Sequence, residues 1–185
     1  MTLAAYKAAI RNPLTPGTVT FLLREQEVLL GLKKRGFGAG YYTGIGGKVE
    51  EEKDRTSKEQ RFLSVAKNGA IREIDEEIGV KVAPEQLQPM GVLRFYFPHV
   101  RDERWNQEVY VFIANTWQGE PFPKEDASGV IEIAPQWFKR AKVPYEQMWD
   151  DAHYWLPAIL KGKNIEAEFV IDADLKVTDS DIRYT

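Results

Sequence analysis

Three glutamates within one turn of a predicted helix, Glu73, Glu76 and Glu77, restrict what this chain can fold into more than any other feature. A helix places their carboxylates on one face and three isoleucines on the opposite face. Like charges at these spacings repel one another and lower helix stability. The acidic face is therefore either a solvated surface or a site where a hard divalent cation such as Mg²⁺ meets carboxylates and substrate phosphates.

A glycine-rich segment at residues 44–50 precedes this turn, and Gly79 follows it. In this combination the chain resembles the Nudix hydrolase family, whose signature begins at a glycine such as Gly47 and ends in the Arg-Glu, Glu-Glu and Gly found at positions 72–79. The resemblance implies an α/β fold, the Nudix α/β/α sandwich around a central mixed β-sheet.

The spacing inside the signature departs from the family pattern. The family places thirteen residues between the glycine and the arginine, whereas residues 48–71 make twenty-four here, so we predict an insertion at about 50–64. Counted back from Arg72, the first glutamate of the signature falls on Ser64. Its supporting role is lost unless Glu52 or Glu59 takes it over.

Composition limits the classes of protein to consider. A chain of 185 residues suits one domain, and we expect an N-terminal extension at 1–16 without a function of its own and a single domain at 17–185. The chain has no cysteine, which excludes cysteine nucleophiles and thiolate metal sites. The net charge of -3 gives no basic footprint for a nucleic acid polymer. We expect a cytoplasmic monomer or weak homodimer that binds no membrane and no nucleic acid polymer.

Apolar and β-branched runs predict the strands of the sheet. A hairpin is expected at 18–23 and 27–32, followed by strands at 90–97, 107–116, 130–133, 165–172 and 175–178, with Trp137 and Phe138 in a helix or turn. Two overlapping capping boxes after Thr56 predict that a helix begins near residue 57. Whether one long helix or two lead into the acidic turn stays open.

Glu132 lies among apolar neighbours in the strand expected at 130–133. It is either the polar residue of an alternating edge strand or a fourth carboxylate at the acidic site. In the family a glutamate stands just before Pro-x-Trp-Phe, as Glu132 does here, which favours a metal or base role. The resemblance implies that Mg²⁺, or Mn²⁺, is bound by Gly47, through its carbonyl, and by Glu73, Glu76, Glu77 and Glu132. In the mechanism that this suggests, Glu77 or Glu132 accepts a proton from the attacking water, and Arg72 orients the glutamates.

Residues 33–40, 137–138 and 148–157 resemble one branch of the family, the oxidised purine nucleoside triphosphatases, which cleave 8-oxo-dGTP and related nucleotides to monophosphate and pyrophosphate. The resemblance implies that the nucleoside triphosphate is contacted by Thr18, Lys33, Phe37, Thr43, Phe95, Trp149 and Asp151. Thr43 and Ala152 replace an asparagine and a second aspartate of the branch, which leaves the preferred base open. Two alternatives remain: a Nudix hydrolase of another diphosphate-linked substrate, or an inactive nucleotide-sensing module.

Overall fold

A mixed sheet of eight strands forms the centre of the protein, whose computed structural model describes residues 2–58 and 60–185. The strands are β1 (Thr15–Arg24), β2 (Glu27–Lys33), β3 (Tyr42–Thr43), β4 (Gln88–Tyr96), β5 (Gln107–Ala114), β6 (Ile133–Lys139), β7 (Ile165–Ile171) and β8 (Val177–Tyr184). The helices are α1 (Leu3–Ala9), α2 (Glu51–Asp54), α3 (Phe62–Ile78) and α4 (Ala152–Leu160), with short 3-10 turns η1 (Pro84–Gln86), η2 (Glu103–Trp105), η3 (Arg140–Lys142) and η4 (Tyr145–Gln147).

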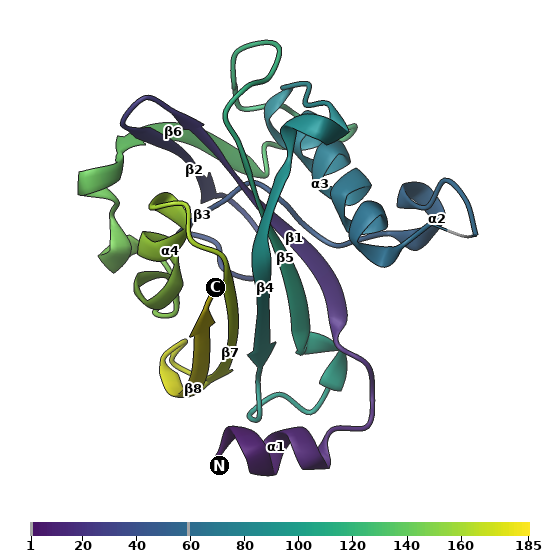
Figure 1. Ribbon diagram of the computed structural model, residues 1–185, viewed down its shortest axis with the longest axis vertical. Helices are drawn as coiled ribbons and strands as arrows, with labels where there is room; N and C mark the ends of the chain where they lie inside the picture. The colour runs from purple at the N-terminus through teal and green to yellow at the C-terminus, as the bar shows by residue number, and fades with distance from the viewer. Residues whose placement is uncertain (1, 59) are drawn as a thin grey trace.

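The strand order is β3-β2-β1-β5-β4-β7-β8, and β6 also pairs with β2. β1 runs parallel to β5 and β4 runs parallel to β7, whereas the other pairs are antiparallel. α3 and α4 lie on opposite sides of the sheet (Figure 1). This arrangement confirms the predicted α/β/α sandwich around a mixed sheet.

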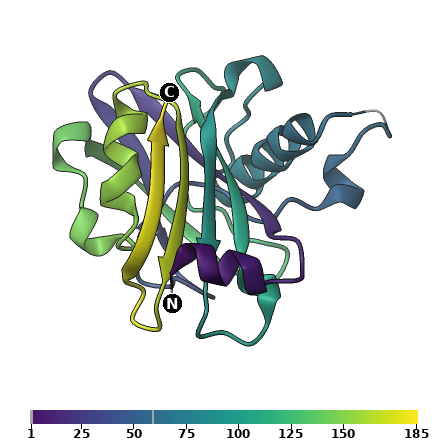
Figure 2. The ribbon, with the colours of Figure 1, turned by 60° about the horizontal axis from the view of Figure 1, so that its bottom comes forward.

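Alternation along β1 builds both layers of the core. Phe21 packs in the cluster that includes Trp155 of α4, and the next residue, Leu22, packs in the cluster that includes Ile74 of α3. Successive strand residues point to opposite faces, so one buried strand serves both helices. α1 packs through Leu3 and Tyr6 against β4 and β7, and it lies across the lower part of the sheet (Figure 2).

The region before the acidic turn contains two helices, and the predicted helix start near residue 57 is wrong. α2 ends at Asp54, and α3 begins only at Phe62. The Thr56 backbone N–H donates to the Gln60 side-chain oxygen at 2.8 Å, so this pair closes a turn in place of a capping box. α3 ends where predicted, at Gly79, which adopts the left-handed conformation with φ of 68° that favours glycine.

The strand predicted at 130–133 is also misplaced. β6 begins at Ile133 and runs through Trp137 and Phe138, which we had predicted in a helix or turn. Trp137 packs against the α3 side of the core and Phe138 against the α4 side, and this two-residue alternation is that of a strand. Glu132 therefore lies directly before the strand and not within it.

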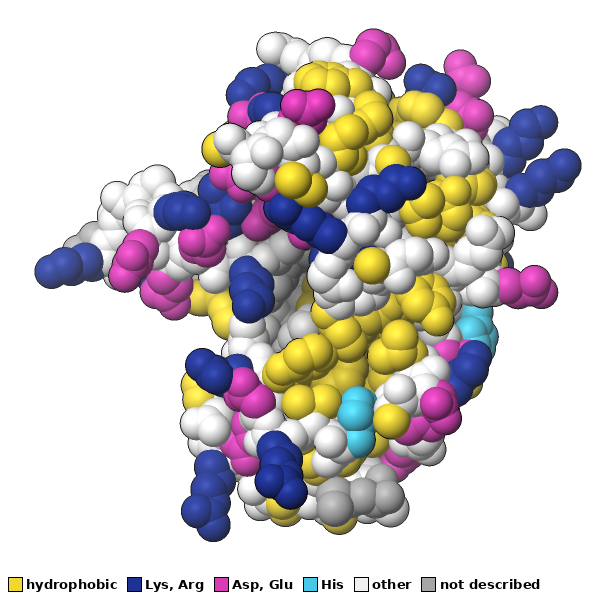
Figure 3. Space-filling model, turned by 180° about the vertical axis from the view of Figure 1, so that it is seen from behind, with side chains coloured by type: hydrophobic (Ala, Val, Ile, Leu, Met, Phe, Trp, Pro, Cys, Tyr) yellow, Lys and Arg dark blue, Asp and Glu magenta, His cyan; other side chains and the backbone are white. Residues whose placement is uncertain are grey.

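α2 projects from the body of the molecule (Figure 1). Seen from behind, the projecting part carries both basic and acidic side chains, and a hollow opens beside hydrophobic side chains near the centre of this face (Figure 3). In the described part of the chain, no helix is both long and apolar enough to cross a membrane.

Candidate active site

Arg72 on α3 connects the carboxylates of the acidic turn to α2. Its Nε lies 2.9 Å from Oδ1 of Asp54, and its Nη2 lies 3.1 Å from Oδ2. Its Nη1 donates to Glu73 at 2.8 Å and to Glu76 at 3.0 Å. The hydrogen bonds with Asp54 and then Glu73 raise the pKa of Arg72, although burial opposes the shift. Arg72 thus fixes the orientation of the two glutamates relative to α2.

Asp54 is the acidic partner that the sequence analysis missed. It is 2% exposed, its Oδ2 accepts from the Glu50 N–H at 2.8 Å, and its carbonyl accepts from Asn68. A Cβ at position 69 would lie 2.8 Å from Oδ2, so Gly69 makes room for the carboxylate. This glycine, one turn before Arg72, is the signal in the sequence that points to a buried partner.

Of the two residues that we considered for this supporting role, Glu52 makes no ion pair with Arg72 among the described residues. Glu52 is exposed, and the contacts of Arg72 go to Asp54 instead. Glu59 lies outside the described residues. Asp54, the last residue of α2, thus gives Arg72 a buried carboxylate partner from within the segment 50–64.

Glu73 and Glu77 lie beside the glycine-rich loop. The Gly46 N–H donates to Oε2 of Glu77 at 3.1 Å, and Glu77 is 7% exposed. A Cβ at Gly47 would lie 2.7 Å from the carboxyl carbon of Glu73, so only glycine permits this approach. Burial raises the pKa of both glutamates, and the charge of Glu73 raises the pKa of Glu77 further. The two largely buried carboxylates of Glu73 and Glu77 thus lie next to the glycine-rich loop.

Glu76 and Glu132 lie farther from this place. The side chain of Glu76 is 56% exposed and contacts Arg72. Glu132 lies 3.6 Å from Nζ of Lys33 and 3.4 Å from Nη2 of Arg35. Its charge still contributes to raising the pKa of Glu73 and Glu77, so it faces the same site.

The donor atoms at this site suit a hard divalent cation. Carboxylate oxygens dominate, and the Gly47 carbonyl, which accepts from the Thr18 N–H at 2.8 Å, keeps a second lone pair. Within residues 2–58 and 60–185, no three acidic or histidine side chains stand close enough together to hold a metal ion. The site therefore brings Gly47, Glu73 and Glu77 together and leaves Glu76 and Glu132 at its edge.

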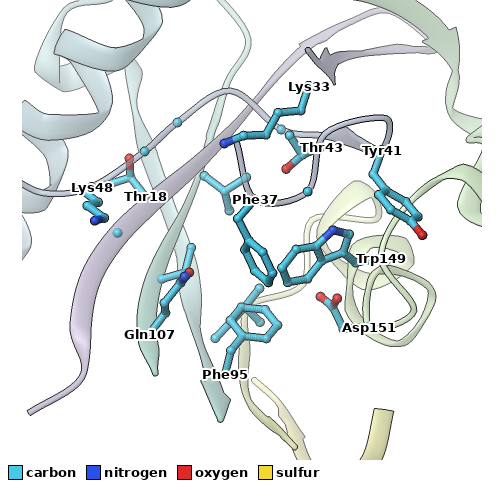
Figure 4. A pocket seen from close by; sticks show the side chains of 18 of the residues that line it. Thr18, Lys33, Phe37, Tyr41, Thr43, Lys48, Phe95, Gln107, Trp149 and Asp151 are labelled. Carbon is cyan, nitrogen blue, oxygen red and sulfur yellow. The ribbon is translucent and has the colours of Figure 1, made fainter. Parts of the chain in front are cut away.

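A cavity of about 800 Å³ adjoins the glycine-rich loop. All seven residues predicted to contact the nucleotide line it, from Thr18 and Lys33 at one side to Trp149 and Asp151 at the other (Figure 4). Further residues that line the cavity were not predicted from the sequence, among them Tyr41, Lys48, Trp105 and Gln107. The one sequence signal for Trp105 is that it is a lone tryptophan within the largely polar stretch 98–106.

Two buried polar atoms on the wall of this cavity have no hydrogen-bond partner among the described residues, the hydroxyl of Thr18 and Oδ1 of Asp151. The other Asp151 oxygen accepts from Nε1 of Trp155 at 2.7 Å. Burial raises the pKa of Asp151 to about 6. Buried polar groups are nearly always hydrogen-bonded, so these two atoms have hydrogen-bonding capacity that the described side chains do not use.

We predict that Asp54→Ala lowers the free energy of unfolding by about 3 kcal/mol, because it leaves the largely buried Arg72 without its main partner. Urea unfolding measures the change. Asp181→Ala, which breaks an exposed pair with Arg183, is the matched control and should leave the midpoint unchanged. Equal midpoints for wild type and Asp54→Ala would contradict the importance of the pair.

We predict that Asp151→Asn raises the free energy of unfolding at pH 7 by about 2 kcal/mol, because the wild-type carboxylate ionises in a buried site. The folded protein holds this proton more tightly than the unfolded chain, so the wild type regains stability as the pH falls from above 6 to about 4, and the difference vanishes there.

Asp150→Asn is the control of opposite sign. Although burial opposes it, hydrogen bonds from Val177 and Lys176 lower the pKa of Asp150. This variant should therefore be less stable than the wild type at pH 7, and the difference should shrink only below about pH 4, where the wild-type carboxylate takes up a proton. Urea unfolding from about pH 2 to 8 measures both. A pH-independent difference for Asp151→Asn would show that its carboxyl is not perturbed.

Comparisons with known proteins agree with this geometry. Residues 13–159 match the NUDIX domain family. The chain is 36% identical over 155 residues to the oxidized purine nucleoside triphosphate hydrolase of Mus musculus, covering 82% of this chain and 83% of the relative. It is 34% identical over 152 residues to the protein of the same name from Danio rerio, with the same coverage.

The fold also resembles a MutT protein structure from Bacillus halodurans, with a TM-score of 0.67 and 19% identity over 91% of this chain and 97% of that one. The family match covers most of the chain, and it includes both the acidic turn and the residues on the cavity wall. The chain belongs to the Nudix family.

Proposed function

We propose that this protein hydrolyses oxidised purine nucleoside triphosphates such as 8-oxo-dGTP to monophosphate and pyrophosphate, and so removes damaged nucleotides from the pool. One observation carries the proposal: the cavity joins the acidic site at Gly47 to a largely aromatic wall that ends at the unpartnered oxygen of Asp151. The volume of about 800 Å³ lies in the range of small-molecule sites, and we place the phosphates near Gly47 and the base near Asp151. The names of the two relatives support the same substrate class.

Nudix hydrolases generally use divalent metals. In this chain Mg²⁺ or Mn²⁺ would be held by the Gly47 carbonyl and by Glu73, Glu76, Glu77 and Glu132. Such a cation, when bound, offsets the charge of the triphosphate and lowers the pKa of water. Glu76 and Glu132 would have to turn inward from their present contacts with Arg72, Lys33 and Arg35.

Glu77 or Glu132 accepts the proton of the attacking water. The water oxygen forms a bond to one of the two phosphorus atoms that flank the anhydride bond between the α- and β-phosphates. That bond breaks, and the products are monophosphate and pyrophosphate. Burial raises the pKa of the Glu77 carboxyl, so this group holds an accepted proton more tightly than an exposed glutamate does. Lys33 and Lys48, which line the cavity, add positive charge along the path of the phosphates (Figure 4).

Base recognition falls to the other end of the cavity. Phe37, Phe95 and Trp149 offer flat apolar surfaces, and Oδ1 of Asp151 accepts a hydrogen bond from the edge of the base. Thr43 supplies a hydroxyl where the related branch has an amide, and Ala152 supplies no polar group. Each missing partner costs about 1–3 kcal/mol of discrimination, so the preferred base differs in strength or identity from that of the branch.

The proposal is tested by pyrophosphate and phosphate release from 8-oxo-dGTP, dGTP, dATP and pyrimidine triphosphates, with ADP-ribose included, in the presence of Mg²⁺. A preference for the oxidised purine, with pyrophosphate as product, is the expected result. Activity confined to ADP-ribose would keep the hydrolase and reject the base assignment. Nucleotide binding without turnover would favour a sensing module.

We predict that Glu77→Gln lowers turnover at least about 100-fold, because it removes a proton acceptor and a charged ligand. The amide keeps the shape of the side chain and can still accept from the Gly46 N–H, so the thermal midpoint should not fall. Glu120→Gln, an exposed residue, is the matched control. Turnover by Glu77→Gln within a few fold of wild type would remove Glu77 from the catalytic set.

The expectations of a cytoplasmic location, a monomer or weak homodimer, and no binding to membranes or nucleic acid polymers remain predictions.

A further inference from the structure

Four aromatic rings meet at the mouth of the cavity. The ring of Phe37 lies 4.5 Å from that of Trp105 and 4.7 Å from that of Trp149, measured between centroids, and both contacts are edge to face. Phe97, which is 1% exposed, lies beneath them at 5.9 Å from Phe37. Phe37 thus lies between two indoles, while the residue as a whole stays 38% exposed.

The backbone that carries Phe37 is a glycine-rich loop between β2 and β3. Gly36, Gly38 and Gly40 have φ values of 71°, 86° and 90°, a region that glycine enters without strain. Such a loop has several accessible conformations, so its position depends on side-chain contacts as well as on its own hydrogen bonds. The two indoles supply these contacts for Phe37.

Trp105 itself stands on a loop that the N-terminal segment supports. One carboxylate oxygen of Glu103 accepts from the Arg11 N–H at 3.1 Å and from the Asn12 N–H and side-chain amide at 2.9 and 2.8 Å. The Thr15 hydroxyl donates to the Arg104 carbonyl at 2.6 Å. These contacts join η2 to the residues just before β1.

A further bond closes the same loop from the other side. The Thr15 N–H donates to the Asn106 carbonyl at 2.8 Å, and the Asn106 side chain accepts from the Phe97 N–H at 2.9 Å. Asn106 is 1% exposed, so this connection is buried. The loop that carries Trp105 is therefore anchored at both ends, whereas the loop that carries Phe37 is rich in glycine.

We propose that Trp105 is a positioning residue of the nucleoside pocket. Its indole holds the Phe37 ring in the position at which Phe37 contacts a bound purine nucleoside triphosphate. The proposal rests on the proposed function for the identity of the ligand. The indole of Trp105 is held in place by its anchored loop and fixes the position of the Phe37 ring. Phe37 in turn contacts the base. The segment before β1, expected to have no function of its own, takes part by supporting Trp105.

Calorimetry measures the dissociation constant of the α,β-methylene analogue of 8-oxo-dGTP in the presence of Mg²⁺. Pyrophosphate release from 8-oxo-dGTP itself measures kcat. Trp105→Ala should weaken binding about three- to tenfold, the size of one aromatic pair, and leave kcat within about twofold. Phe37→Ala should weaken binding at least as much. Tyr184→Ala, an exposed aromatic residue outside the cavity, is the control and should change neither.

The double variant decides whether Trp105 acts through Phe37. If it does, adding Trp105→Ala to Phe37→Ala should weaken binding by less than about twofold more. Additive losses, or unchanged binding by Trp105→Ala, would overturn the inference. If the wild type binds the analogue but releases no pyrophosphate from 8-oxo-dGTP, the proposed function alone is rejected. If the wild type does not bind the analogue, both the proposed function and this inference are contradicted.

Discussion

The ion pair between Arg72 and Asp54 is the interaction on which the geometry of the acidic site depends, because it joins the helix that carries the glutamates to the segment before it. Arg72 also reaches the Lys48 carbonyl at 3.0 Å, next to Gly47. One guanidinium thus sets the distance between α2, α3 and the glycine-rich loop. Arginine suits this task because its planar group donates in several directions at once and stays charged when partly buried.

The glycine-rich loop is joined to the cavity wall through β1. The Thr18 N–H donates to the Gly47 carbonyl, and Thr20 exchanges backbone hydrogen bonds with Ile45 at 2.7 and 2.9 Å. The glycine-rich loop is therefore fixed to the same strand that contributes Thr18 to the cavity wall. The position of the loop relative to this part of the wall is therefore set by backbone hydrogen bonds, which helps to orient a bound phosphate for reaction.

Much of the fold and most of the cavity wall could be predicted from the sequence. Alternating and apolar runs located β1, β2, β4, β5 and β7 to within a few residues, and the glutamate spacing located the end of α3. The seven cavity residues came from the family resemblance. β6 was misplaced because Trp137 and Phe138 stand after a proline and among polar residues, and their pairing with β2 depends on contacts distant in the sequence.

Asp54 could not be found by spacing, because the longer segment shifts the carboxylate out of its expected register and delivers it from a separate helix. Trp105 was not predicted for a related reason. Its loop is polar, and the place of this loop at the cavity depends on hydrogen bonds between its neighbours Glu103 and Arg104 and residues about 90 positions away. Both residues act through tertiary contacts that leave no periodic pattern in the sequence.

The affinity for Mn²⁺, measured from the electron paramagnetic resonance of the free ion, tests most directly whether the Arg72–Asp54 pair organises the acidic site. Folded Asp54→Asn should bind Mn²⁺ at least about tenfold more weakly than wild type, because a neutral partner no longer fixes Arg72 and, through it, Glu73. Equal affinity of the two proteins would contradict the account and would limit the pair to a role in stability.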